Sequence, residues 1–258
     1  MNKITLLHLS ILFSLSCVFI SCDKDDDKDP DPVPAVPAKM SIKMDHQAGS
    51  DKFYLDSTYT NANGDDFTPD LFKYYISNIR LIRNDNYEYS IPNTYFLINH
   101  DQPASMTLTL NNLMTGAYKS IKFMLGVDST RNVIGSQTGA LDPVNGMFWD
   151  WNTGYIFFKL EGTSPAIPGA FVYHVGGFSG ANVNYREISI DFDGDLLQVA
   201  QNKDPELHMV TDVLELFQNP TTINMATFPA NVISANASAT TLANNYADLF
   251  RYDHIHNK

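Results

Sequence analysis

Cysteine is nearly absent from this chain of 258 residues, occurring only at Cys17 and Cys22. A disulfide framework needs cysteines spread through the fold, and Cys-rich zinc or iron–sulfur sites need several close together. Both classes are excluded for the sequence after residue 22. Any metal bound there must use ligands other than thiolates.

Positive charge is also scarce. The chain has 17 Lys and Arg against 29 Asp and Glu, which gives a formal net charge of −12. Nucleic-acid binding depends on Lys and Arg contacts to phosphates, so we expect no nucleic-acid partner. Global disorder is excluded as well, because 44% hydrophobic and 12% aromatic residues can form a sizeable core.

The usual catalytic motifs are missing. The sequence has no Gly-rich phosphate loop, no Gly-x-Ser-x-Gly elbow and no His-Glu-x-x-His. We therefore expect a binding protein and not an enzyme. A hydrolase would need two converging carboxylates, one with a raised pKa. The candidates for such a pair are Asp128, Asp142, Asp150 and Glu161.

The N-terminus has the pattern of a secretory signal. A single Lys3 precedes an apolar run over residues 4–20, and Ser21-Cys22 follows. Residues 19–22 resemble a bacterial lipoprotein signal, which implies removal of residues 1–21 and lipidation of Cys22. The alternative is an uncleaved anchor, but a run of 17 residues is at the short limit for a span. Lipidation would hold the protein on a membrane without crossing it.

Residues 22–38 are expected to form a tether. Acidic residues dominate 23–29, and prolines stiffen 30–37 into an extended spacer. A cysteine followed by an acidic cluster resembles a surface-export signal of some Gram-negative lipoproteins. That resemblance implies a cell-envelope location, at the outer membrane and exposed on the surface. The folded domain is then residues 39–258.

Hydrophobic alternation with a period of two predicts an all-β domain. In residues 40–46, Ile42, Met44 and His46 share one face. Short segments of this kind, separated by turn residues, predict an antiparallel β-sandwich. Further strands are expected at residues 73–82, 94–98, 106–110, 121–127, 155–160, 188–192 and 207–216.

Two helices are expected in addition. Leu242, Tyr246, Leu249 and Phe250 recur at helical spacing and predict a short C-terminal helix. Thr68-Pro69-Asp70 has the cap and first-turn residues of a second helix.

The histidines are the main candidates for metal ligands. His254 and His256 lie two apart, so in an extended chain their imidazoles project to the same side. The alternative is a solvated polar tail. His46 falls on the apolar parity of its strand, where a hydrogen-bonded core histidine is the simpler explanation. His174 ends a strand before a glycine turn. His100 and His208 have no distinguishing context.

Both tryptophans, Trp149 and Trp151, lie in one aromatic block. The structural interpretation is an aromatic plug over one end of the sandwich. Nearby Asp128, Asn132 and Asp142 would cap turns, or could weakly favour a calcium ion, although their spacing is not that of an EF-hand. A third interpretation is a stacking platform for a glycan or protein partner, which requires exposed tryptophans.

Several blocks along the chain resemble the MbnP-like copper-binding protein family. They are Lys73-Tyr74-Tyr75-Ile76-Ser77-Asn78-Ile79-Arg80-Leu81, Gly126-Val127-Asp128, Leu141-Asp142-Pro143, Gly146-Met147-Phe148-Trp149-Asp150-Trp151-Asn152-Thr153-Gly154-Tyr155, Lys159-Leu160-Glu161-Gly162, Tyr173-His174-Val175-Gly176-Gly177 and His254-Ile255-His256-Asn257. The resemblance implies an exported β-sandwich that captures copper.

The same resemblance implies a set of site residues. In some relatives a partner di-haem enzyme oxidises a tryptophan to kynurenine, whose aryl amine joins histidines around copper. Trp149 and Trp151 are the possible kynurenine precursors here. The implied metal ligands are His46, His174, His254 and His256, with His46 and the C-terminal pair preferred. Such neutral donors suit Cu(I) without a thiolate.

Overall fold

The structure is a computed structural model that describes residues 37–149 and 154–258. The signal, residues 22–36 of the tether and two site candidates, Asp150 and Trp151, lie outside these ranges. Residues Val36–Lys258 form one compact unit, and its first strand begins at Ala38, next to the predicted domain start. Within the described ranges, no helix is both long and apolar enough to cross a membrane.

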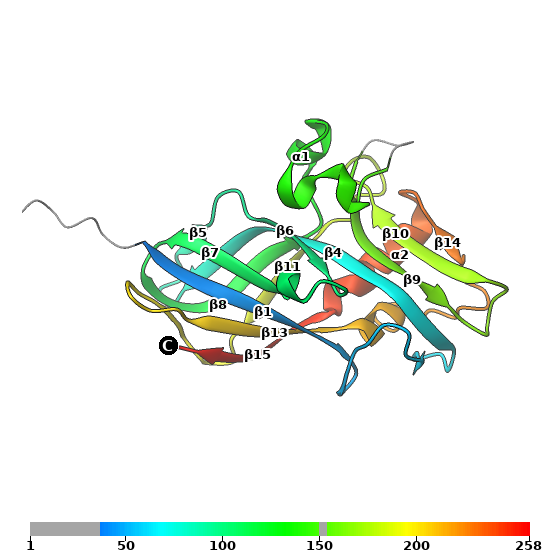
Figure 1. Ribbon diagram of the computed structural model, residues 1–258, viewed down its shortest axis with the longest axis horizontal. Coiled ribbons are helices and arrows are strands. Elements are labelled where there is room, and N and C mark those ends of the chain that lie inside the picture. The colour runs from blue at the N-terminus through cyan, green and yellow to red at the C-terminus, as the bar shows by residue number, and fades with distance from the viewer. Residues whose placement is uncertain (1–36, 150–153) are drawn as a thin grey trace, which may run out of the picture. The chain divides into compact units, whose positions relative to one another are not determined.

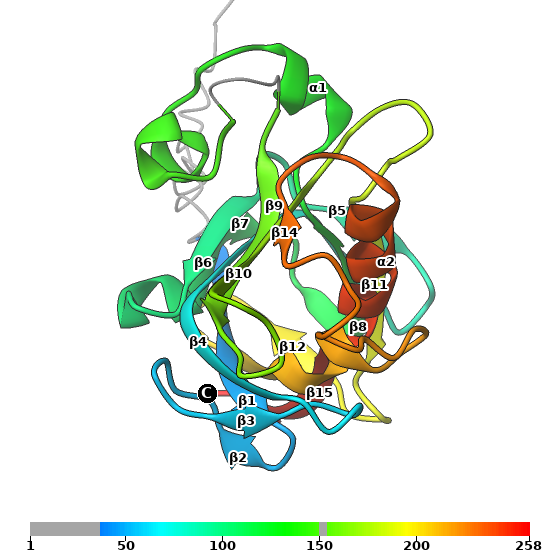
Figure 2. The same cartoon turned by 90° about the vertical axis from the view of Figure 1, so that its right-hand side faces the viewer.

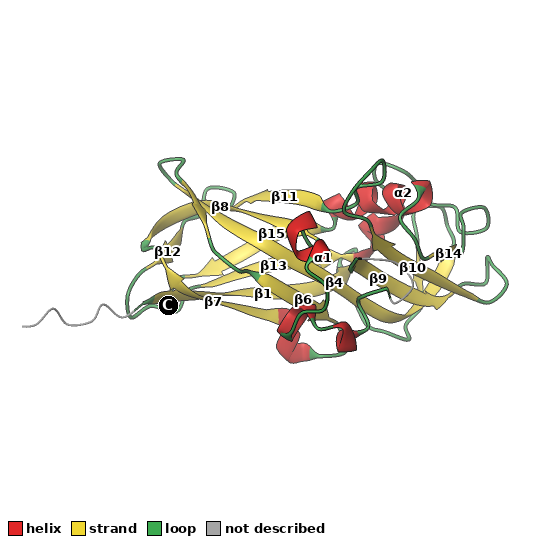
Figure 3. Cartoon of the chain, turned by 90° about the horizontal axis from the view of Figure 1, so that it is seen from above, coloured by secondary structure: helices red, strands yellow, loops and turns green. Residues whose placement is uncertain are grey.

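The prediction of an all-β sandwich with a short C-terminal helix is confirmed. Figure 3 shows strands throughout the domain and only short helical segments. The smaller sheet has β1 near its centre (Figure 1), and most of its pairings are antiparallel, although β1 and β13 run parallel. Its strands are β15 (Phe250–His256), β13 (Glu206–Asp212), β1 (Ala38–Ala48), β2 (Asp51–Lys52) and β7 (Thr107–Leu113).

The larger sheet is built around β4 (Asp66–Arg83), which pairs with strands along both of its edges. The main path also contains β11 (Arg186–Asp191), β8 (Gly116–Leu125), β9 (Ile156–Thr163), β10 (Ala170–Gly176) and β14 (Asn231–Val232). The short strands β3 (Tyr59–Thr60), β5 (Glu88–Ser90), β6 (Tyr95–Asn99) and β12 (Leu197–Val199) pair beside it.

Helices are few and short. The α-helices are α1 (Ser129–Val133) and α2 (Ala237–Asn245), and α2, red in Figure 2, packs against β10. The 3-10 segments are η1 (Pro103–Met106), η2 (Gly139–Leu141), η3 (Pro143–Asn145), η4 (Val213–Phe217) and η5 (Tyr246–Asp248). The predicted C-terminal helix is therefore α2 with η5, and β15 begins at Phe250.

Two local predictions are wrong. Thr68-Pro69-Asp70 does not begin a helix, because it lies inside β4, where the pairing with β9 shifts register between Pro69 and Leu71. A proline fits a strand at such an irregularity. The strand predicted over residues 207–216 ends at Asp212. There the Asp212 side chain accepts a hydrogen bond from the Leu214 amide and caps η4 instead.

Alternation along the strands divides the apolar residues between two clusters. The main core contains the buried residues of both sheets, including Ile42, Met44 and Tyr74. A second cluster forms where Tyr75 points to the opposite side of β4, together with Trp149 and Tyr155. Consecutive residues of a strand project to opposite faces, so Tyr74 and Tyr75 mark the two sides of the larger sheet. His46 lies on the main-core side of β1.

Candidate metal centre

The described histidines occur in three separate places. His46 meets His100, the C-terminal pair His254 and His256 meets His208, and His174 meets Glu161. The structure therefore brings together histidines that are far apart in the sequence. It does not bring the four predicted ligands together.

His46 is held in the core by its strand. Its side chain is 4% exposed, and its parity with Met44 directs it inward as the alternation predicts. The Phe72 ring lies 4.8 Å from the imidazole, centre to centre, and Phe53 packs edge-on at 6.5 Å. These rings remove water from one side of the imidazole and restrict its rotation. The remaining side faces His100.

The two imidazoles approach each other through their Nδ1 atoms. His100 follows the end of β6, and its Nδ1 lies 2.8 Å from Nδ1 of His46. The rings stack with their centres 5.1 Å apart and their planes 19° apart. An imidazole nitrogen binds a transition metal at about 2.0–2.1 Å. One ion can therefore contact both Nδ1 atoms with only a small adjustment of the rings.

A buried hydroxyl chain orients His46. Its Nε2 lies 3.0 Å from the Tyr74 hydroxyl, which lies 3.0 Å from Oγ1 of Thr211. When Nε2–H donates to Tyr74 and Tyr74 donates to Thr211, Nδ1 of His46 is left as a bare acceptor. A metal ligand is commonly oriented by a hydrogen bond from its second nitrogen. Burial also raises the pKa of Tyr74, so its hydroxyl stays protonated.

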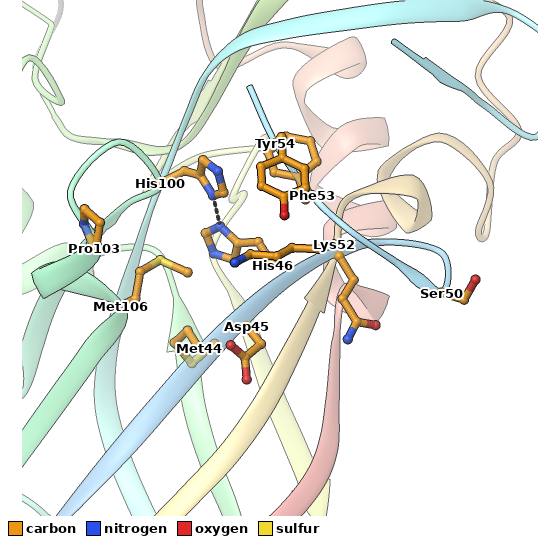
Figure 4. Close-up of a pocket in the computed structure, with 11 residues that line it drawn as sticks. Met44, Asp45, His46, Ser50, Lys52, Phe53, Tyr54, His100, Pro103 and Met106 are labelled. Atoms are coloured by element: carbon orange, nitrogen blue, oxygen red, sulfur yellow. Dashed lines mark hydrogen bonds between the residues drawn. The ribbon is translucent and has the colours of Figure 1, made fainter. Parts of the chain in front are cut away.

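The pair opens onto a cavity of about 620 Å³. Met44 and Met106 line it, and the end of the Met106 side chain extends toward His46 (Figure 4). Asp45 and Lys52 also line the cavity and give it one charge of each sign. Thioether sulfur is a soft donor that favours Cu(I). The walls thus offer imidazole and thioether groups around one space.

Both imidazoles are kept neutral. Burial places the pKa of His46 well below its ordinary value, and the neighbouring His100 lowers it further. Burial also lowers the pKa of His100; Asp101 opposes this, and Lys52 adds to it. A metal binds the neutral form of imidazole, so protons compete weakly for these nitrogens near pH 7.

The C-terminal pair lies on the other face of the smaller sheet. His254 is opposite His208, which is itself in register with Lys43 on β1. Lys43 and His46 have opposite parity on their strand, and only His46 faces the core. The expected combination of His46 with His254 and His256 is therefore not formed.

His174 is hydrogen-bonded to Glu161, which also pairs with Lys159. Its Nε2 lies 2.7 Å from Glu161, whose carboxylate also lies 3.5 Å from Nζ of Lys159. Burial is the largest influence on His174 and lowers its pKa, although Glu161 acts in the opposite direction. The Glu161 carboxylate that a hydrolase would need is thus shared between the His174 imidazole and the Lys159 ammonium group.

Trp149 is packed against the protein and not displayed on its surface. It is 4% exposed in the second apolar cluster, and its ring lies against the backbone of Gly176. This burial opposes a stacking platform for glycans at Trp149. Nearby Asp128 caps α1, and Asp142 caps η3, as the structural interpretation predicts. The Asn132 side chain donates a hydrogen bond to the Val127 carbonyl and accepts one from the Tyr155 amide. All three residues considered for calcium therefore bind protein groups.

Two histidines were missed by the sequence reasoning. His100 is the direct partner of His46, and His208 is the direct partner of His254. The only available signal was position, because His100 lies two residues after the strand expected at 94–98 and His208 lies inside another expected strand. Each pairing depends on strand register between distant segments, which hydrophobic alternation does not determine.

Comparison with known proteins gives a family and one similar fold. The family model described as MbnP matches residues 37–236. Among solved structures, MbnP from Methylosinus trichosporium is similar, with 13% sequence identity and a TM-score of 0.49. That alignment covers 74% of this chain and 80% of the other. No curated protein matches the sequence.

Proposed function

The chain belongs to the MbnP family, and from this premise we propose that it captures copper through the buried pair His46 and His100. The observation that carries the proposal is the 2.8 Å approach of their Nδ1 atoms. The resemblance of the sequence to copper-binding members suggests the metal. The close approach of the two imidazole nitrogens suggests where the ion binds.

The donor set fits Cu(I). Two neutral imidazoles and the thioethers of Met44 and Met106 surround the cavity, and all of these donors are uncharged. A monovalent ion among neutral ligands leaves less uncompensated charge in an apolar wall than a divalent ion would. Imidazole and thioether are also donors that Cu(I) accepts without a thiolate. The proposed role is capture of the ion and not catalytic turnover.

Two further parts of the proposal rest on the sequence. We propose that lipidated Cys22 anchors the domain in the cell envelope, at the outer membrane. We also propose that a partner di-haem enzyme converts Trp149 or Trp151 to kynurenine, which would add an aryl amine to the available donors. An intact-mass spectrum of protein from its native host would detect both the lipid on Cys22 and the oxidised tryptophan. A mass without lipid and with both indoles intact would contradict both.

Copper binding at the buried pair is tested by anaerobic titration of Cu(I) against a competing chromophoric chelator. The His254→Ala/His256→Ala background removes competition from the exposed histidines. In it, His46→Gln or His100→Gln should weaken binding about tenfold or more, since each removes one ligand. His174→Gln is the matched control, because that histidine binds Glu161 and should leave the affinity unchanged. Wild-type affinity in both ligand variants would overturn the proposal.

A further inference from the structure

We propose that His208, His254 and His256 form a second metal site, for a divalent ion such as Zn²⁺ or Cu²⁺, on the outer face of the smaller sheet. This site is independent of the buried pair. Two of its three ligands lie beyond residue 236, where the match to the family model ends. The family resemblance groups His254 and His256 with His46 around copper, whereas the site proposed here joins them to His208 and takes a divalent ion.

Strand pairing assembles the three imidazoles. β13 and β15 run antiparallel, with His208 opposite His254 and Glu206 opposite His256. The register shifts directly after His208, where Met209 pairs with Tyr252. His254 and His256 are two residues apart on an extended strand, so they project to the same face. The alternation of β15 thus places two ligands beside the one that β13 supplies.

The side-chain geometry suits one ion. One ligand atom from each histidine lies within 4.8 Å of the other two. Nε2 of His254 and Nε2 of His256 are 3.1 Å apart. The His208 ring stacks on His254 with centres 4.2 Å apart, and it stands at 86° to His256. Ligands about 2.0–2.1 Å from one ion lie at most about 4.2 Å apart, so small side-chain rotations would bring the three nitrogens to a common centre.

A second observation points to a ligand at this place. Nε2 of His208 is buried and has no hydrogen-bond partner among the described residues. Leaving a buried polar atom unsatisfied costs about 1–3 kcal/mol in typical proteins. A metal ion held jointly with His254 and His256 would satisfy that nitrogen. This atom is therefore the expected ligand of His208.

Carboxylates support the cluster from outside. Asp253 lies 2.9 Å from Nδ1 of His254, which leaves Nε2 of that ring for the metal. Asp45 lies 3.8 Å from Nδ1 of His208 on the side away from the buried nitrogen. A carboxylate behind a ligating imidazole is common in zinc sites. These two negative charges favour a divalent over a monovalent ion.

The ligand set leaves a position for solvent. His256 is exposed, whereas His208 and His254 are partly buried, so the cluster opens outward at its C-terminal end. Three histidines with one open position form a known type of Zn²⁺ site. Imidazole also suits Cu²⁺ and Ni²⁺. The donor set contains no thioether among these three residues, in contrast to the walls around His46.

The test uses Co²⁺ and Zn²⁺ in a protein carrying His46→Gln and His100→Gln. This background should still bind one equivalent of Zn²⁺ and give the visible absorption of tetrahedral Co²⁺. Adding His208→Ala, or His254→Ala with His256→Ala, should weaken Zn²⁺ binding about tenfold or more and abolish that absorption. His174→Ala is the control and should change neither readout.

The outcome separates this site from the proposed function. An unchanged Zn²⁺ titration and Co²⁺ spectrum in both histidine variants would overturn the second site. Loss of Cu(I) binding at His46 and His100 would not affect it. Circular dichroism should show that each variant is folded, since β15 keeps its backbone pairing with β13. If His208→Ala unfolds the protein, the variant at the C-terminal pair His254 and His256 still decides the question.

Discussion

At the scale of single residues, Tyr74 is the side chain on which the buried pair depends. Its hydroxyl bonds both Nε2 of His46 and Oγ1 of Thr211 inside the core. Tyr74→Phe should leave two buried polar groups without a partner, at a cost of about 1–3 kcal/mol in unfolding free energy each. His46 should also lose the hydrogen bond that fixes its tautomer, and Cu(I) affinity should fall about tenfold.

Tyr75→Phe, at the next residue, is a matched control for Tyr74→Phe. The Tyr75 hydroxyl donates to the carbonyl of Ala140 on the opposite side of β4. Tyr75→Phe therefore removes one tyrosine hydroxyl from the same strand without touching His46. Urea unfolding should show a loss for both variants, but chelator competition should show weaker Cu(I) binding for Tyr74→Phe alone. Equal affinities would show that Tyr74 has no positioning role.

At this scale the sequence predicts His46 of the buried pair, and His254 and His256 of the outer cluster. Alternation over residues 40–46 correctly directs His46 toward the core, and the spacing of His254 and His256 correctly puts them on one face. The partners His100 and His208 could not be found in this way. Their positions depend on pairings between strands that are separate in the sequence, and a shift of one residue would turn each side chain to the other face.

At the scale of strands, Gly162 shows how closely β4 and β9 approach. A Cβ at this position would lie 2.3 Å from the Thr68 carbonyl oxygen and 2.8 Å from the Pro69 Cα. Both are backbone atoms that cannot turn away. Gly162→Ala should therefore push the two strands apart and lower the free energy of unfolding by about 1–3 kcal/mol. Urea denaturation measures this loss.

The neighbouring exposed position provides the control for that change. Thr163 ends β9 and faces solvent, so Thr163→Ala should alter stability by no more than about 0.5 kcal/mol. A Gly162→Ala variant as stable as this control would mean that the strands can separate at this point without loss of packing.

Element prediction succeeded where one side of a strand faces the core. The alternating segments of β1, β8 and β11 are found close to their expected places. It failed where a local signal competed with tertiary pairing. The cap and proline of Thr68-Pro69-Asp70 favour a helix, yet the pairing of β4 with β9 outweighs them. In residues 207–216, Asp212 ends the strand by capping η4, which the apolar pattern conceals.

At the scale of the whole molecule, the smaller sheet separates two sets of histidines. His46 and His100 lie on its core side, and the cluster of His208, His254 and His256 lies on its outer side. The first set is carried by β1 and the end of β6, the second by β13 and β15, and no side chain is shared. The two proposed sites should therefore load independently, and each can be removed without removing the other.

The histidines should also make the metal-free domain sensitive to acid. Burial lowers the pKa values of His46, His100, His174 and His208 in the folded protein. In the unfolded chain these imidazoles take up protons at their ordinary pKa of about 6.5. Below that pH the unfolded state binds more protons, so stability falls as pH falls toward the lower folded pKa values. Above it, these groups contribute no pH dependence.

His46 should dominate this loss, because it is the most deeply buried of the four. One imidazole that stays neutral on folding contributes at most about 1.4 kcal/mol for each pH unit below 6.5. Unfolding by urea at pH 7.5, 6.5 and 5.5, with a chelator present, should show a steepening loss in the wild type. His46→Gln should reduce the slope, while Thr163→Ala at the exposed end of β9 should keep it. A slope unaffected by His46→Gln would mean that His46 takes up its proton without unfolding, and that the buried pair is more open to water than its packing against Phe53 and Phe72 requires.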